Sequence, residues 1–193
     1  MKKWHNHSSA ALKRKLLVFD FDDTIVTTEC KVIVNYPDGS SEKMSTDAFK
    51  NHQKKEENDY DFSEFAEVVN PRLNKEVASI VEHFVRSKSH RDEIVVLTAR
   101  QSAARPAVKA YLASIGFEVP ADLKLVTLDD SRPQAKADWI ENRIKSGAVE
   151  ILFMDDSRAN VEAVRYLYKR YPQHINLALY LKHFWTYLMM KWD

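Results

Sequence analysis

The chain has 193 residues, of which 45% are hydrophobic and 30% charged, ordinary values for a single globular domain with its own core. Lysine and arginine (29) nearly balance aspartate and glutamate (28), which excludes an overall field that recruits nucleic acid or anionic membrane. The single cysteine, Cys30, excludes an internal disulfide and a thiolate metal site. It favours a reducing, cytoplasmic setting.

Neither end of the sequence predicts a membrane span. The first 15 residues are basic but lack the apolar segment of a secretory signal. The longest apolar-rich stretch, residues 177–190, contains Lys182 and His183 and is too short to cross a bilayer. A terminal strand and helix packed on the core is the preferred interpretation, and a contact with a membrane or a partner is the alternative.

Short apolar runs predict the strands of a parallel sheet. They cover residues 15–21, 93–99, 123–128, 150–155 and 175–180. Each run is almost continuously apolar, which is typical of strands buried on both faces.

Amphipathic segments between these runs predict helices. The first is expected to start at Asn70-Pro71, with Val77, Val81 and Phe84 on its buried face. Others are expected from near Pro106 to Gly116, from near Pro133 to Gly147, and after Asn160. Strands that alternate with helices in this way predict an α/β fold with a doubly wound parallel sheet, forming one domain over residues 1–193.

Residues 27–69 interrupt the alternation. The segment 31–44 predicts a β-hairpin that turns at Pro37-Asp38-Gly39. The polar segment 46–59 predicts a helix or loop with a solvated face. Because this insertion follows the first strand, we expect it to form a small cap over the carboxyl edge of the sheet, where open α/β sheets bind ligands.

Polar residues gather after four of the predicted strands. In chain order they are Asp20, Asp22, Thr24, Thr98, Arg100, Lys136, Asp155, Asp156 and Asn160. Parallel strands end at one edge of their sheet, so residues more than a hundred positions apart are expected to meet there.

The chemistry of these side chains points to phosphoryl transfer. Carboxylates from two strand ends form an all-oxygen site suited to Mg²⁺ and a substrate phosphate. Zinc is disfavoured, because the sequence offers no matching set of cysteines and histidines. A carboxylate beside such a site can attack phosphorus. The hydroxyl of Thr98 and the ammonium of Lys136 can stabilise the equatorial oxygens.

The same residues resemble the motifs of the haloacid dehalogenase (HAD) superfamily. Asp20-Phe21-Asp22-Asp23-Thr24 is similar to its DxDx[T/V] first motif, although Asp23 stands where glycine is frequent. Thr98, Lys136 and Asp155-Asp156-x-x-x-Asn160 resemble the second, third and fourth motifs, in order, over roughly residues 15–180. The resemblance implies a HAD-like Rossmannoid fold and a Mg²⁺-dependent phosphomonoesterase that works through an aspartyl-phosphate.

The resemblance also implies roles for the acidic residues. Asp20 would be the nucleophile and a metal ligand. Asp22 would be general acid and then general base, and would bind the metal through its backbone carbonyl. Asp156 would be the main carboxylate ligand of the fourth motif, with Asp155 as a ligand or beside one.

The remaining residues are expected to face the substrate phosphate. Thr98 and Lys136 would hold the phosphoryl group, and Lys136 would also offset the charge of Asp20. Thr24, Arg100 and Asn160 are expected on the substrate side.

A narrower resemblance concerns segments 68–84, 93–100 and 155–167, which look similar to the phosphatase domain of phage polynucleotide kinase-phosphatases. In that family an arginine two residues after the second-motif hydroxyl assists phosphate binding, and Arg100 matches its position. The chain contains no GxxxxGK[ST] kinase motif, so the resemblance implies phosphatase activity alone.

Each assignment has an alternative. Lys124 competes with Lys136, but it opens a strand at the opposite edge of the sheet, which favours Lys136. Asn160 is expected to cap a helix, to orient Asp156, or to do both. Surface salt bridges are the alternative for Arg100 and for Arg158.

The substrate stays open at this stage. Weakly capped members of the superfamily that the chain resembles often act on phosphates carried by macromolecules, so the resemblance favours such a substrate, for example a nucleic-acid 3′-phosphate. A phosphotyrosine protein, a nucleotide or a small metabolite is the alternative, as is a non-catalytic phosphate-binding adaptor. A response-regulator receiver would place its phospho-acceptor after the third strand, and the Asp20-x-Asp22 pair disfavours that class.

Overall fold

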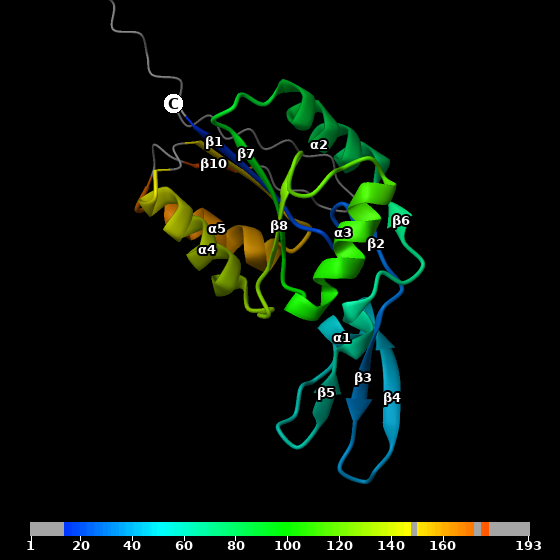
Figure 1. The fold of residues 1–193 in the computed structure, drawn as a ribbon. Helices are drawn as coiled ribbons and strands as arrows, with labels where there is room; N and C mark the ends of the chain where they lie inside the picture. The colour runs from blue at the N-terminus through cyan, green and yellow to red at the C-terminus, as the bar shows by residue number, and fades with distance from the viewer. Residues whose placement is uncertain (1–13, 148–149, 172–174, 178–193) are drawn as a thin grey trace, which may run out of the picture.

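A parallel sheet forms the centre of the molecule, for which the computed structural model describes residues 14–147, 150–171 and 175–177. Its strands are β1 (Lys15–Phe19), β7 (Glu93–Thr98), β8 (Lys124–Thr127), β9 (Glu150–Met154) and β10 (Ile175–Leu177). They lie in the order β10-β9-β1-β7-β8, and every neighbouring pair is parallel (Figure 1). The predicted α/β class and its parallel strands are confirmed.

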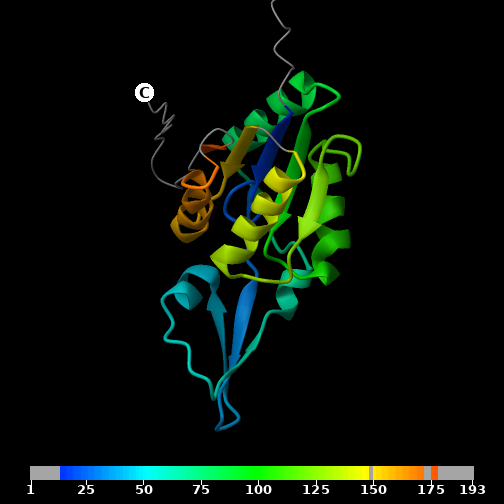
Figure 2. The same cartoon turned by 90° about the vertical axis from the view of Figure 1, so that its left-hand side faces the viewer.

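Helices cover both faces of this sheet (Figures 1 and 2). On one face lie α2 (Lys75–Ser87) and α3 (Arg105–Ser114), and on the other α4 (Pro133–Lys145) and α5 (Arg158–Tyr168). Side chains of β1 alternate between the two layers, since successive residues of a strand point to opposite faces. Leu17 and Phe19 join the core under α2 and α3, whereas Leu16 and Val18 join the core under α4 and α5.

The start of α2 differs from the prediction. The helix begins after Asn74, whose side chain accepts the Val77 N–H at 3.3 Å, because this asparagine supplies the N-cap oxygen. Asn70 instead adopts a positive φ of 43°. Two residues further on, β6 (Arg72–Leu73) pairs with β2 (Val26–Thr27). The start at Asn70-Pro71 is therefore wrong, but the predicted buried positions Val77 and Val81 are confirmed.

The start of α5 also differs from the prediction. Ser157 is its N-cap and accepts the Asn160 N–H at 3.4 Å. The cap assignment for Asn160 is wrong because Ser157 occupies the cap position three residues earlier. The predicted starts of α3 and α4 near Pro106 and Pro133 are confirmed.

The insertion, residues 27–69, forms its own small sheet. β3 (Lys31–Asn35) and β4 (Ser41–Ser45) make the predicted antiparallel hairpin, and β5 (Asp59–Asp61) pairs with the other side of β3. The short helix α1 (Thr46–Lys50) follows β4, and the 3₁₀ turn η1 (Ser63–Ala66) follows β5. Figures 1 and 2 show this sheet projecting from the end of the molecule at which β1 ends.

Among the described residues, no helix is both long and apolar enough to cross a membrane. The predicted strand and helix at 175–190 lie outside those residues, except for β10.

Candidate functional site

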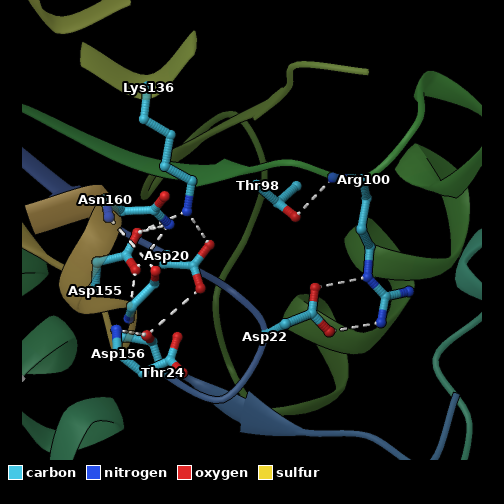
Figure 3. A network of polar contacts seen from close by, with 10 residues as sticks. Asp20, Asp22, Thr24, Thr98, Arg100, Lys136, Asp155, Asp156 and Asn160 are labelled. Atoms are coloured by element: carbon cyan, nitrogen blue, oxygen red, sulfur yellow. Dashed lines mark hydrogen bonds and ion pairs between the residues drawn. The ribbon is translucent and has the colours of Figure 1, made fainter. Parts of the chain in front are cut away.

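Two neighbouring strands bring acidic side chains together at the carboxyl edge. β1 pairs with β9 so that Phe19 lies opposite Met154, and the Asp20 N–H continues the pairing to the Met154 carbonyl at 2.9 Å. The residues that follow each strand therefore lie side by side (Figure 3). Carboxylate oxygens of Asp20, Asp155 and Asp156 all lie within 4.8 Å of one another, a grouping able to hold a metal ion.

Lys136 lies between two of these carboxylates. Its ammonium donates to Asp20 Oδ1 at 2.5 Å and to Asp155 Oδ2 at 2.7 Å, and the side chain is only 3% exposed. Lys136 reaches them from the first turn of α4, which Pro133 starts. Lys124, by contrast, pairs with Glu93 at the opposite edge of the sheet, so Lys136 is the lysine that reaches the acidic group.

Asp155 is fully buried and surrounded by donors. Asn160 Nδ2 contacts both of its oxygens, at 3.0 and 3.1 Å, the Ser157 N–H donates to Oδ1 at 2.8 Å, and Lys136 donates to Oδ2. A carboxylate has about four acceptor positions, so these contacts occupy most of what Asp155 offers. Asp20 and Asp156 are therefore better placed to supply metal ligands, and Asn160 holds Asp155.

Thr24 ties the two acidic segments together. Its buried hydroxyl donates to Asp20 Oδ2 at 3.5 Å and accepts the Asp156 N–H at 3.0 Å. The hydroxyl that was expected to face a substrate is thus used inside the protein, where it fixes Asp20 relative to Asp156.

Asp22 points away from this group toward Arg100 (Figure 3). Arg100 Nε and Nη2 donate to its two carboxylate oxygens at 2.8 and 2.7 Å, a bidentate geometry that is strong and directional. Arg100 is only 5% exposed, so the surface-salt-bridge alternative is wrong for this residue. Burial alone would lower the pKa of Arg100, but the Asp22 carboxylate outweighs that effect and raises it.

Thr98 ends β7 beside this pair. Its hydroxyl oxygen accepts the Arg100 N–H at 3.2 Å and the residue is 1% exposed. Arg158, in contrast, is exposed at the start of α5, in agreement with the surface interpretation.

The electrostatics of the acidic group are unbalanced. Burial raises the pKa of Asp20 well above its usual value, the carboxylates of Asp155 and Asp22 raise it further, and Lys136 opposes them. Burial would lower the pKa of Lys136, but Asp20 and Asp155 together raise it, so this lysine carries its charge. A cation bound by Asp20 and Asp156 would relieve the remaining negative charge, and a hard, all-oxygen donor set fits Mg²⁺.

Sequence reasoning missed several supporting residues. Ser157 was recognisable from its position, since a serine just before a helical pattern is a typical N-cap. The backbone carbonyls of Phe65 and Glu67, which accept hydrogen bonds from Arg100, carry no sequence signal. Their role depends on how the insertion folds back onto the core.

The fold and site define an α/β protein with a buried acidic group and one lysine at the carboxyl edge of a parallel sheet. The family model described as "Protein of unknown function (DUF2608)" matches residues 1–131, and the chain belongs to that family. No curated protein matches it.

Two solved structures are similar to the chain. One is described as "Structure of the Pnkp1/Rnl/Hen1 RNA repair complex", with 14% identity and a TM-score of 0.49, covering 90% of this chain and 45% of that chain. The other is described as "Structure of Pnkp1/Rnl/Hen1 complex", with 14% identity and a TM-score of 0.45, covering 93% of this chain and 52% of that chain. This chain thus spans about half the length of each.

Proposed function

We propose that the protein is a HAD-type, Mg²⁺-dependent phosphatase that hydrolyses a phosphomonoester through an aspartyl-phosphate intermediate. The observation that carries the proposal is the convergence of Asp20, Asp155 and Asp156 around the buried ammonium of Lys136. A fold needs no such group for stability, because burying like charges together is unfavourable. The four ordered motifs of the sequence supply the superfamily assignment.

In this mechanism Asp20 is the nucleophile. One of its oxygens forms a bond to phosphorus while the bond from phosphorus to the leaving oxygen breaks, and Asp22 gives that oxygen a proton. Asp22 then takes a proton from water, whose oxygen attacks phosphorus and releases Asp20 and inorganic phosphate. Asp20 and Asp156 would hold the Mg²⁺, with the backbone carbonyl of Asp22, and the ion would supply positive charge next to the phosphoryl oxygens.

The other residues position these groups. Lys136 offsets the charge of Asp20 and faces the phosphoryl oxygens, and Thr98 offers a hydroxyl to the same oxygens. Asn160 and Ser157 hold Asp155, which in turn holds Lys136. Thr24 fixes Asp20 relative to Asp156.

For the substrate we propose a phosphate carried by a macromolecule, with a nucleic-acid 3′-phosphate as the first candidate. In the part of the chain that the structure describes, the insertion is small and no large second cap covers the carboxyl edge, which suits a bulky substrate. The narrower sequence resemblance points to polynucleotide ends. Phosphotyrosine proteins, nucleotides and small metabolites form the comparison set.

The test is hydrolysis of 4-nitrophenyl phosphate with and without Mg²⁺. The wild type is expected to turn it over only with the metal, Asp20→Asn is expected to be inactive, and the exposed Asp138→Asn on α4 is the matched control. Turnover by Asp20→Asn would refute the covalent mechanism. A wild type without turnover but with phosphate binding would favour the adaptor alternative. A panel of 3′-phosphorylated oligonucleotide, phosphotyrosine peptide, nucleotide and sugar phosphate then ranks the substrates.

A further inference from the structure

Arg100 joins the candidate site to the insertion through one guanidinium group. Nε and Nη2 donate to the Asp22 carboxylate at 2.8 and 2.7 Å. Nη1 donates to the carbonyl oxygen of Phe65 at 2.8 Å and to that of Glu67. Nη2 also contacts the Thr28 hydroxyl at 3.3 Å. A guanidinium has five N–H donors on three nitrogens. Through these contacts, each of the three nitrogens of Arg100 bonds to the core or to the insertion.

The surroundings of Arg100 hold it in place. Its side chain is 2% exposed. The guanidinium carbon lies 5.4 Å from the centre of the Phe21 ring and 5.5 Å from that of the Phe65 ring. One ring comes from the loop after β1 and the other from η1 of the insertion, so a cation–π contact forms on each side of the boundary. A buried cation that loses these partners is costly, and any displacement of the insertion removes several of them at once.

We infer that Arg100 is a positioning residue that couples the seating of the insertion on the core to the direction of the Asp22 carboxylate. The two insertion carbonyls fix the guanidinium, and the fixed guanidinium orients Asp22 through two hydrogen bonds. The inference deepens the proposed function, on which its catalytic part rests: the insertion then controls where the proton-transferring group lies. It differs from a direct phosphate-binding role for Arg100, because its donors are already in use within the protein.

The thiol of Cys30 can report whether the insertion stays seated around Arg100. Cys30 is the only cysteine and is 2% exposed. Its thiol contacts the Glu67 carbonyl at 3.6 Å and lies 3.7 Å from Arg100 Nη2. The rate at which a thiol reagent modifies Cys30 therefore reports how firmly the insertion is seated around Arg100.

In the first experiment, Cys30 modification by an aromatic disulfide reagent is compared in the wild type, Arg100→Ala and Arg86→Ala. Arg86 is an arginine of α2 that is 77% exposed and pairs with Glu82 at the i,i+4 spacing. We expect Arg100→Ala to react at least about tenfold faster, as local opening becomes easier, and Arg86→Ala to match the wild type. If Arg100→Ala does not fold, Arg100→Lys takes its place, because one ammonium cannot span Asp22 and both carbonyls. An unchanged rate overturns the coupling.

The second experiment compares a phosphate ester with a poor alkyl leaving group and 2,4-dinitrophenyl phosphate, which needs no proton donor. Misplacing Asp22 in Arg100→Ala should lower kcat/KM, which covers the steps up to release of the leaving group, by about 10²-fold or more for the alkyl ester and by less than about tenfold for the dinitrophenyl ester. The comparison uses kcat/KM because Asp22 also serves as the base in hydrolysis of the shared aspartyl-phosphate, so kcat should fall for both esters. Asp22→Asn should show the same difference between the two esters. The double variant, Arg100→Ala with Asp22→Asn, should lose no more activity than Asp22→Asn alone. Equal losses of kcat/KM on both esters indicate a phosphate contact and overturn the positioning role.

The two experiments separate this inference from the proposed function. A wild type that hydrolyses neither ester refutes the phosphatase. The Cys30 measurement needs no turnover, so it still supports or overturns the link between Arg100 and the insertion.

Discussion

The two ends of the central sheet both bury charge, but with opposite balances. At the amino end one carboxylate, Glu93 at the start of β7, has three cationic partners: Arg14 at 2.8 Å, Lys124 at 2.9 Å, and Arg143. At the carboxyl end one ammonium, Lys136, lies between Asp20 and Asp155, with the Asp156 carboxylate close by.

Exposure decides what each cluster can do. The cations around Glu93 are partly exposed: Arg14 by 39%, Lys124 by 57% and Arg143 by 28%. Water therefore solvates their excess positive charge, and the cluster needs no role beyond stabilising the fold. At the carboxyl end Lys136, Asp20 and Asp155 are 3%, 8% and 0% exposed. Water cannot relieve the excess of negative charge there, and a proton or a bound cation must do so. Such unbalanced burial is typical of functional sites.

The largest expected effect comes from Asp20→Asn, which removes the proposed nucleophile. Phosphatase activity should fall on the order of 10⁴-fold or more, as in other enzymes that lose one essential catalytic group. The fold should not suffer, because burial raises the pKa of Asp20. When folding raises the pKa of an acidic group, the protein loses folding stability as the pH rises above the group's ordinary pKa, which is 3.8 for Asp20. An asparagine at this position avoids that loss. We therefore expect the metal-free variant to melt no lower than the wild type at pH 7.

The strand prediction succeeded because its signals are local. A short apolar run that ends in aspartates marks both a buried strand and its edge, and the parallel arrangement alone brings Asp20 next to Asp155. Helix starts were less certain because several residues near each start can cap it. The N-cap of α2 is Asn74 where the prediction had Asn70, and the N-cap of α5 is Ser157 where the prediction had Asn160.

The least predictable feature was the environment of Arg100. Its sequence position suggested either a phosphate ligand or a surface residue. Its burial depends on backbone carbonyls at Phe65 and Glu67, which any residue type could supply. Contacts of that kind follow from how the insertion packs and leave no pattern in the side chains.

Lys136→Met should have the next largest effect, because it removes the buried cation at the carboxyl end. Leaving Asp20 and Asp155 without it should cost about 3–5 kcal/mol of unfolding free energy at pH 7 in the metal-free protein. The pKa of Lys136 is raised in the folded state, so its contribution is fully present at neutral pH. Urea unfolding measures the difference, and Lys124→Met, a half-exposed lysine at the other end, should cost less than about 1 kcal/mol. Equal losses for the two variants would contradict the comparison.

Metal should stabilise the carboxyl end specifically. At a Mg²⁺ concentration of 100 times Kd, binding to the folded state adds about 2.7 kcal/mol, seen as a higher melting temperature, and EDTA should abolish turnover. Asp156→Asn should lose most of this response, whereas Glu93→Gln should keep it. A Mg²⁺ shift that survives in Asp156→Asn would place the metal elsewhere.

The smallest effect is expected at the amino end, from Glu93→Gln. Burial alone would raise the pKa of Glu93, but Lys124, Arg14 and Arg143 outweigh it and lower the pKa below 4.5. An acid with a lowered folded-state pKa stabilises the fold above its usual pKa and loses that contribution as pH falls through the folded-state value. The variant should therefore be less stable by about 2 kcal/mol at pH 7, with the gap closing only below pH 4.5. Its Mg²⁺-dependent turnover should equal that of the wild type, since the excess charge at this end is already solvated; a loss of turnover in a folded variant would show that the two ends of the sheet do not act separately.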